Sequence, residues 1–349
     1  MSRDADIPEP DRLAGAPHPR ETLTLVGHQE AESAFLDGLA SGRLHHAWLI
    51  GGPYGIGKAT LAYRVARRLL DREAGAATLD VPAESRAARQ VAALSHPNLA
   101  VLRRTVRPDG KGVTTTIPVD AVRRALDVFG STAADGGYRI CIVDSAEDLA
   151  AAGANALLKV IEEPPPRSLF LIVSHAPQRV LPTIRSRCRR LMLRPLSAPQ
   201  IEAVIAGLGP PWAEAPADLR RDAIALAEGS VRRTLERLDE TTIAFVGSVT
   251  RTLDALPKVD PKAVLALAET LAKRDAVENY ELALDTVQRW VGDRLRRDAA
   301  LGAGRLAPLV EVCDKASRQA REVDIYNLDR RPLILALFDD LADAVRRTA

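Results

Sequence analysis

The sequence predicts an α/β nucleotide-binding domain that is followed by helical domains. Between residues 29 and 173, short apolar strands alternate with amphipathic helices, and polar residues gather where the strands end. From about residue 196 onward the apolar spacing is helical and is interrupted only at glycines and prolines. The predicted fold class is therefore α/β plus all-α, with a parallel sheet in the first domain.

The first half of the α/β domain is expected to run helix, strand, loop, helix. Apolar positions recur at helical spacing over residues 29–40, and the short apolar run 46–50 is typical of a strand. The glycine-rich segment 51–57 then leads into a helix with apolar residues from Leu61 to Leu70. Strand, glycine-rich turn and helix in this order are the context of a phosphate-binding loop.

The second half of this domain carries the remaining strands. The continuous apolar runs 140–143 and 169–173 are typical of strands buried on both faces of a parallel sheet. Residues 99–104 and 113–117 are expected to pair as strands around a turn at 108–110. The helices expected in this half span residues 119–129 and 150–161.

The chain is expected to divide into a tail and three domains. Residues 1–22 are rich in proline and charge and lack periodicity, which predicts a flexible tail. Ser197 and Gln200 have the spacing of a helix-opening capping box, so a new domain is expected to start there. The expected domains are the α/β domain at 23–195, a small helical domain at 196–240 and a larger helical domain at 241–349.

Composition excludes several classes of protein. The 48 basic and 46 acidic residues leave a net charge of +2, which argues against a strongly cationic nucleic-acid-binding protein. The three cysteines are far apart and the six histidines lack metal-site spacing, so no disulfide framework and no zinc site are expected. No apolar run approaches the ~20 residues of a membrane span. The N-terminus lacks a secretory signal, so we expect a cytoplasmic protein without a membrane partner.

Residues 52–58 match the pattern G-x-x-x-x-G-K of a phosphate-binding loop. The glycines Gly52, Gly55 and Gly57 let successive backbone N–H groups point at phosphate oxygens. Lys58 adds a positive charge at the N-terminus of a helix, which itself favours anions. ATP is the expected ligand, and the alternative is an ordinary glycine-rich turn.

The positions that would hold Mg²⁺ are incomplete. Ala59 stands where serine or threonine would offer a hydroxyl to the ion, and the Thr60 hydroxyl is turned ~100° around the helix. Asp144 ends a buried strand and could hold Mg²⁺ through a water, or could simply cap the next turn. Magnesium is therefore expected only together with a nucleotide.

The residue that would polarise an attacking water is also missing. Ser145 follows Asp144 where such ATPases usually carry glutamate. Glu147 and Asp148 lie nearby, but their spacing is wrong for this role. The sequence thus predicts a loop that binds nucleotide beside a site that hydrolyses it weakly or not at all.

Three segments resemble one family. Residues 155–165, NALLKVIEEPP, resemble the signature helix of clamp-loader subunits. Residues 186–188 are similar to their S-R-C motif, and residues 41–47 are similar to their opening segment. The family is the AAA+ clamp-loader subunits of bacterial DNA polymerase III, and the resemblance covers about residues 26–235. It implies an AAA+ domain, a helical lid, and a C-terminal helical collar through which subunits assemble.

The resemblance also implies roles for single residues. Arg187 matches an arginine finger that reaches the ATP site of a neighbouring subunit, although 41 of the residues are arginine and a surface role is the alternative. Ser174 matches the first sensor of the γ-phosphate, or serves as a strand-end cap. Arg232 matches the second sensor, on the lid.

Departures from the family pattern favour its non-motor, delta-prime type. Motor subunits keep the hydroxyl and the glutamate that Ala59 and Ser145 replace, and many relatives carry a four-cysteine zinc module that this chain lacks. The implied function is support of ATP-driven loading of the sliding clamp onto primed DNA during replication. The implied partners are the gamma/tau motor subunits and the delta subunit in a hetero-oligomeric ring. Nucleotidyl transfer would belong to the polymerase complex only.

Two other functions remain open from the residues. A self-sufficient AAA+ motor of the gamma/tau kind, or a translocase, would turn over ATP without partners. A P-loop kinase or transferase would need a substrate pocket in the helical lid.

Overall fold

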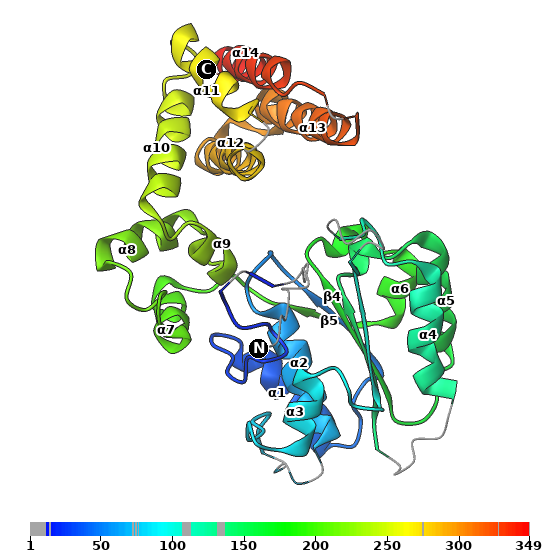
Figure 1. Ribbon diagram of the computed structural model, residues 1–349. Helices are drawn as coiled ribbons and strands as arrows, with labels where there is room; N and C mark the ends of the chain where they lie inside the picture. The colour runs from blue at the N-terminus through cyan, green and yellow to red at the C-terminus, as the bar shows by residue number, and fades with distance from the viewer. Residues whose placement is uncertain are drawn as a thin grey trace. The chain divides into compact units, whose positions relative to one another are not determined.

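The computed structural model describes residues 12–13, 15–71, 73, 75, 77–106, 113–130, 137–273, 276–326 and 328–348. The chain forms two compact units, Met1–Arg237 and Leu238–Ala349 (Figure 1). Each unit has its own hydrophobic core. The first unit contains the sheet and every residue to which the sequence assigns a chemical role.

A five-stranded parallel sheet forms the centre of the first unit, in the order β2-β3-β4-β1-β5. The strands are β1 Ala47–Gly51, β2 Leu99–Arg103, β3 Arg139–Asp144, β4 Ser168–Ser174 and β5 Arg189–Met192. In this register Gly51 lies opposite Ser174, and β3 on the other side of β4 ends at Asp144. Parallel pairing therefore brings the carboxyl ends of β1, β3 and β4 to one edge of the sheet.

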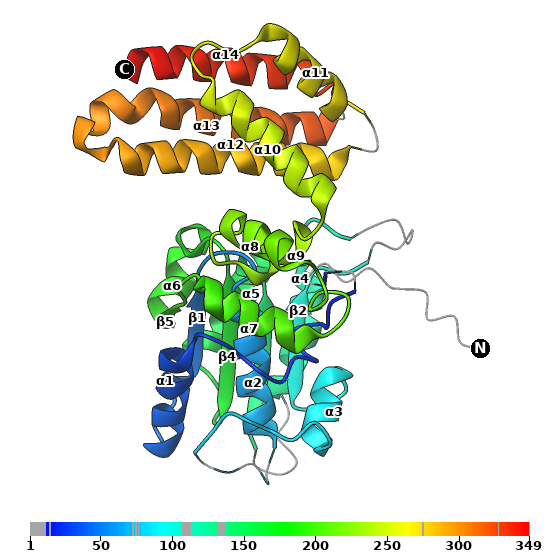
Figure 2. The ribbon, with the colours of Figure 1, turned by 90° about the vertical axis from the view of Figure 1, so that its left-hand side faces the viewer.

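Helices cover both faces of the sheet (Figures 1 and 2). Ile140 and Ile142 of β3 point to the layer of α1 Gln29–Ala40, α2 Lys58–Leu70 and α3 Arg86–Ala92. Cys141 and Val143 point to the layer of α4 Val119–Gly130, α5 Ala151–Glu162 and α6 Pro182–Arg187. Because neighbouring strand residues face opposite sides, a continuous apolar run is buried on both. The predicted helices and buried strands of this domain are thus confirmed.

The expected strand at 113–117 is wrong. The edge strand β2 pairs with β3 in parallel, while Val113 and Ile117 form only isolated bridges, with Val106 and Leu149 respectively. Between them Thr115 and Thr116 are exposed, so this stretch offers the core too little apolar surface to form a strand. The expected turn at 108–110 lies outside the described residues.

The flexible tail expected up to residue 22 is also wrong for residues 15–22, which pack against α2. The side chain of His18 is fully buried, and the Arg67 guanidinium donates to the carbonyls of Arg20 (2.8 Å) and Thr22 (2.6 Å). Arg64, also buried, donates to the carbonyl of Leu23. A buried guanidinium needs acceptors, and this extended backbone supplies them. We call residues 15–26 the N-terminal strap.

Three short helices complete the first unit: α7 Ala198–Leu208, α8 Ala217–Leu226 and α9 Val231–Glu236. The capping box at the start of α7 is confirmed, and the Ser197 N–H donates to the Gln200 side chain at 2.9 Å. Ile201, Ile205 and Leu235 form an apolar cluster with Ala16 of the strap. The strap therefore packs against the helical segment as well as against α2.

The second unit is entirely helical in its described residues. Its α-helices are α10 Glu240–Asp254, α11 Pro261–Leu271, α12 Val277–Arg297, α13 Ala303–Tyr326 and α14 Arg331–Thr348. Leu337, Phe338 and Leu341 of α14 are almost fully buried and pack with residues of the other four helices. The observed α/β unit and helical unit confirm the predicted α/β plus all-α class.

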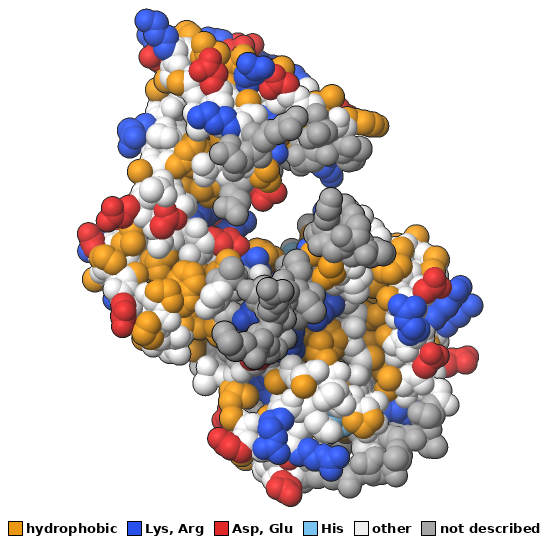
Figure 3. Space-filling view, viewed as in Figure 1, with side chains coloured by type: hydrophobic (Ala, Val, Ile, Leu, Met, Phe, Trp, Pro, Cys, Tyr) orange, Lys and Arg blue, Asp and Glu red, His pale blue; other side chains and the backbone are white. Residues whose placement is uncertain are grey.

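Among the described helices, none has the length and hydropathy needed to cross a membrane. On the face drawn in Figure 3, basic and acidic side chains lie side by side over α4, where Arg123 pairs with Asp120 at 3.3 Å. Both side chains of this pair are largely exposed, so it adds little to stability.

We expect Arg67→Ala to lower the free energy of unfolding by about 3 kcal/mol, since two strap carbonyls lose their buried donor. Arg68→Ala is the matched control. Arg68 donates to the Thr78 carbonyl (3.2 Å) at the surface, so its loss should change the free energy by less than about 0.5 kcal/mol. Urea unfolding followed by tryptophan fluorescence measures both. Equal effects would show that the strap is not held by Arg67.

Candidate nucleotide-binding site

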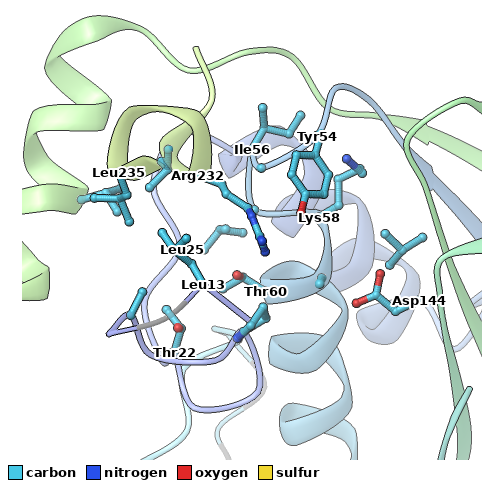
Figure 4. Close-up of a pocket in the computed structure, with 18 of the residues that line it drawn as sticks. Leu13, Thr22, Leu25, Tyr54, Ile56, Lys58, Thr60, Asp144, Arg232 and Leu235 are labelled. Atoms are coloured by element: carbon cyan, nitrogen blue, oxygen red, sulfur yellow. The ribbon is translucent and has the colours of Figure 1, made fainter. Parts of the chain in front are cut away.

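A cavity of about 310 Å³ lies in the first unit, where the carboxyl ends of the strands meet the N-terminus of α2 (Figure 4). The glycine-rich loop, the end of β3, the strap and the short helices α7 and α9 contribute to its wall. The sequence-predicted residues in the wall are Gly55, Gly57, Lys58, Thr60, Asp144 and Arg232. Gly52, Ser174 and Arg187 are described residues but do not line the cavity.

The loop needs glycine where it approaches the lid and where it enters α2. Gly55 has a positive φ of 74°, and a Cβ there would collide with the Ser230 hydroxyl and with Arg232. Gly57 caps α2 with a φ of 98°, which a side chain would strain. The Arg232 N–H donates to the Gly55 carbonyl at 3.3 Å. The start of α9 therefore rests directly on the loop.

Lys58 is buried at the N-terminus of α2. Its side chain is 3% exposed, and its Nζ donates to the Pro53 carbonyl within the loop. Burial lowers the pKa of Lys58 to about 8, although the charges of Asp144 and Glu147 oppose this change. The loop thus holds a desolvated ammonium at the N-terminus of α2, where anions are favoured.

The geometry makes a metal site unfavourable. Figure 4 shows Thr60 and Asp144 on different sides of the first turn of α2, so the hydroxyl and the carboxylate do not converge. Asp148 is engaged elsewhere, since it pairs with Arg104 at 3.1 Å and accepts from the Ser145 hydroxyl at 3.3 Å. Among the described residues, no group of three His, Cys, Asp or Glu side chains could hold a metal ion.

Ser174, the predicted first sensor, is bound to Glu147. Its side chain is fully buried, and its hydroxyl donates to Glu147 Oε1 at 2.5 Å. The Ala176 N–H donates to the same oxygen. Burial opposes ionisation of Glu147, yet these hydrogen bonds hold its pKa below the usual range. The carboxylate is therefore charged at neutral pH.

Arg232, the predicted second sensor, contacts Tyr54 and Glu236. Its guanidinium lies 5.1 Å from the centre of the Tyr54 ring and pairs with Glu236 at 2.8 Å. His175 packs edge-on against the Tyr54 ring as well, with ring centres 4.9 Å apart. Burial and the nearby charge of Lys58 lower the pKa of His175 to about 4, so its ring is neutral.

Arg187 ends α6 outside the cavity. Its Nη2 pairs with Glu162 at 2.7 Å, and its Nη1 donates to the Thr183 carbonyl at 3.0 Å. Glu162 is the last residue of α5, the helix that carries the NALLKVIEEPP signature. Both side chains of the pair are 39% exposed. The guanidinium is therefore at the surface and not in its own chain's cavity.

Sequence reasoning missed the apolar wall. Leu13, Leu25 and Leu235 line the cavity opposite the loop, as Figure 4 shows. It also missed Tyr54, which stands at a variable position of the loop pattern, and His175, which lies outside that pattern. Leu23, Leu25 and Val26, directly after the expected tail, were an available signal, since apolar side chains at this density indicate a packed segment.

Comparison with known proteins finds relatives among two kinds of DNA polymerase III subunit. A family model described as "DNA polymerase III, delta subunit" matches residues 27–197. DNA polymerase III subunit delta' of Pseudomonas aeruginosa is 35% identical over 185 residues, which are 53% of each chain. The delta' subunit of Bacillus subtilis is 32% identical over 46% of this chain and 45% of its own length.

A second group of relatives consists of tau and gamma/tau subunits of DNA polymerase III. DNA polymerase III subunit tau of Escherichia coli is 30% identical over 86% of this chain and 44% of its own length. The chain thus spans about half the length of the relatives it matches. A solved gamma subunit-related protein from Thermotoga maritima is 18% identical, covers 88% of this chain and 99% of its own, and has a TM-score of 0.39.

The buried ammonium predicts a pH dependence of stability. The folded chain releases the Lys58 proton near pH 8, whereas the unfolded chain keeps it to an ordinary pKa of 10.5. Between these values the unfolded state binds more protons, so the free energy of unfolding rises with pH. The free energy of unfolding of the wild type, measured relative to that of Lys58→Met, should rise by roughly 3 kcal/mol between pH ~7 and pH ~10.5. A difference that stays constant in urea unfolding across this range would show that Lys58 titrates as a solvated lysine.

Proposed function

We propose that this chain is a non-motor, delta-prime-type subunit of the DNA polymerase III clamp loader, because residues 27–197 match the family model "DNA polymerase III, delta subunit" and two delta' subunits are among its relatives. One observation carries the proposal. The nucleotide-binding loop is complete, while Ala59 and Ser145 replace the two groups that motor subunits use for metal and water. The chain would therefore bind nucleotide and hydrolyse it weakly or not at all.

The cavity fits a nucleotide. Loop N–H groups, the Lys58 ammonium and the N-terminus of α2 suit the phosphates, and the apolar wall of Leu25 and Leu235 suits a base. The donor set does not suit Mg²⁺ by itself, so the ion would enter only with the phosphates.

Arg187 would serve a neighbouring subunit in this proposal. Its guanidinium lies outside its own cavity and at the surface, held by Glu162 of α5. A planar, always charged guanidinium suits the charge that spreads over a γ-phosphate during transfer. The finger would act in trans, in the ATP site of a gamma/tau subunit.

The roles of the domains and partners are proposed from the resemblance to clamp-loader subunits. Residues 23–195 would be the nucleotide-binding domain, 196–240 the lid, and 241–349 the collar that joins gamma/tau and delta subunits in a ring. The ring would load the sliding clamp onto primed DNA in the cytoplasm. DNA contact would be shared between subunits and made largely to phosphates, which agrees with a net charge of only +2.

A motor of the gamma/tau kind is the second candidate, because the E. coli tau match covers 86% of this chain. The two candidates differ in ATP turnover by the purified chain. We expect turnover no higher than that of its Lys58→Ala variant, because neither metal nor water is positioned. Turnover well above this control would favour the motor.

The finger is tested in a reconstituted clamp loader that contains this chain. Arg187→Ala should slow hydrolysis at the adjacent site by about 10³-fold, the scale of a lost arginine finger. Glu162→Gln is the matched control, since it breaks the same ion pair and keeps the guanidinium. Single-turnover kinetics on complexes of equal size measure the effect. Similar rates for both variants would assign Arg187 a structural role only.

A further inference from the structure

Glu147 occupies the hydroxyl of Ser174, the position that the sequence predicts as the first γ-phosphate sensor. Its Oε1 accepts from the Ser174 hydroxyl at 2.5 Å and from the Ala176 N–H. Its Oε2 is buried and receives no hydrogen bond from the described part of the chain. The carboxylate is thus anchored through one oxygen. Glu147 lies behind the cavity wall, and its negative charge acts on Lys58, which lines the cavity.

The cavity stops short of Ser174. Val173 and His175 line its wall, but Ser174 between them has no exposed surface. A phosphate bound by the loop would therefore meet the side chains around Ser174 before it met the hydroxyl. Arg232 is similarly engaged, with Tyr54 and Glu236. Both positions expected to sense a γ-phosphate are bound by side chains of this chain.

From these contacts we infer that Glu147 stands in for a γ-phosphate, so that the site selects a nucleoside diphosphate over a triphosphate. The inference rests on the proposed nucleotide site and adds its ligand class. Glu147 is a specificity-determining residue in this account and takes no part in bond breaking.

Charge gives the selection its physical basis. Lys58 is desolvated and is already compensated by Asp144 and Glu147. A γ-phosphate would add negative charge beside a buried carboxylate, and like charges at close range in a site of low dielectric repel strongly. A diphosphate satisfies the loop and Lys58 without this repulsion. Discrimination would thus come from a repulsive element aimed at the wrong ligand.

The test is calorimetric titration of the full chain with ADP and with a non-hydrolysable ATP analogue. We expect ADP to bind at least about tenfold more tightly than the analogue, a modest discrimination for a close charge pair. Glu147→Gln keeps the acceptor for Ser174 and removes the charge. This variant should bind the ATP analogue more tightly than the wild type does, and so lose most of the preference for ADP. Glu84→Gln, at an exposed position away from the cavity, should keep the preference.

Each outcome is decisive. Equal affinities in the wild type, or an unchanged preference in Glu147→Gln, would overturn the inference while leaving the nucleotide site intact. If neither ADP nor the analogue binds, the proposed nucleotide site is overturned as well. Ser174→Ala provides a second test if Glu147→Gln does not fold. Since Glu147 already uses this hydroxyl, analogue affinity should change less than about twofold, and a tenfold loss would contradict the inference.

Discussion

The site is organised around one buried positive charge. Lys58 stands at the start of α2 with 3% of its surface exposed, and its desolvation would be prohibitive without partners. Pro53 supplies a carbonyl, and Asp144 and Glu147 supply negative charge from the end of β3 and the turn after it. The parallel sheet makes this possible, because it brings the ends of β1, β3 and β4 to the same edge. A lysine exposed to solvent would not need acidic groups so near the loop.

A second buried charge ties the N-terminal strap to the same helix. Arg67 and Arg64 lie on α2 and donate to strap carbonyls, and Ala16 packs with the helices that follow the sheet. The strap supplies part of the apolar wall of the cavity. Buried guanidinium groups thus decide where a segment without helix or strand lies, and that segment in turn shapes the ligand site.

The proposed site combines groups that suit phosphates with the loss of two groups that hydrolysis needs. In the proposed nucleotide site, Ala59 and Ser145 lack the hydroxyl and the carboxylate that would help to position metal and water. Glu147 and Asp148 do not replace those groups, because hydrogen bonds and the Arg104 ion pair hold them in other roles. Arg187, in contrast, lies at the surface, where it can act on something other than its own chain's ligand.

The sequence alone determined the buried strands, the helices between them, the capping box at Ser197 and the loop that ends at Lys58, because these depend on local periodicity and spacing. It predicted wrongly the strand at 113–117 and the looseness of residues 15–22, and it passed over Tyr54, His175 and the hydrogen bond between Ser174 and Glu147. Only the tertiary structure decided these features. A buried arginine can order a distant segment, and a carboxylate can reach a hydroxyl 27 residues away, and no local pattern encodes such contacts.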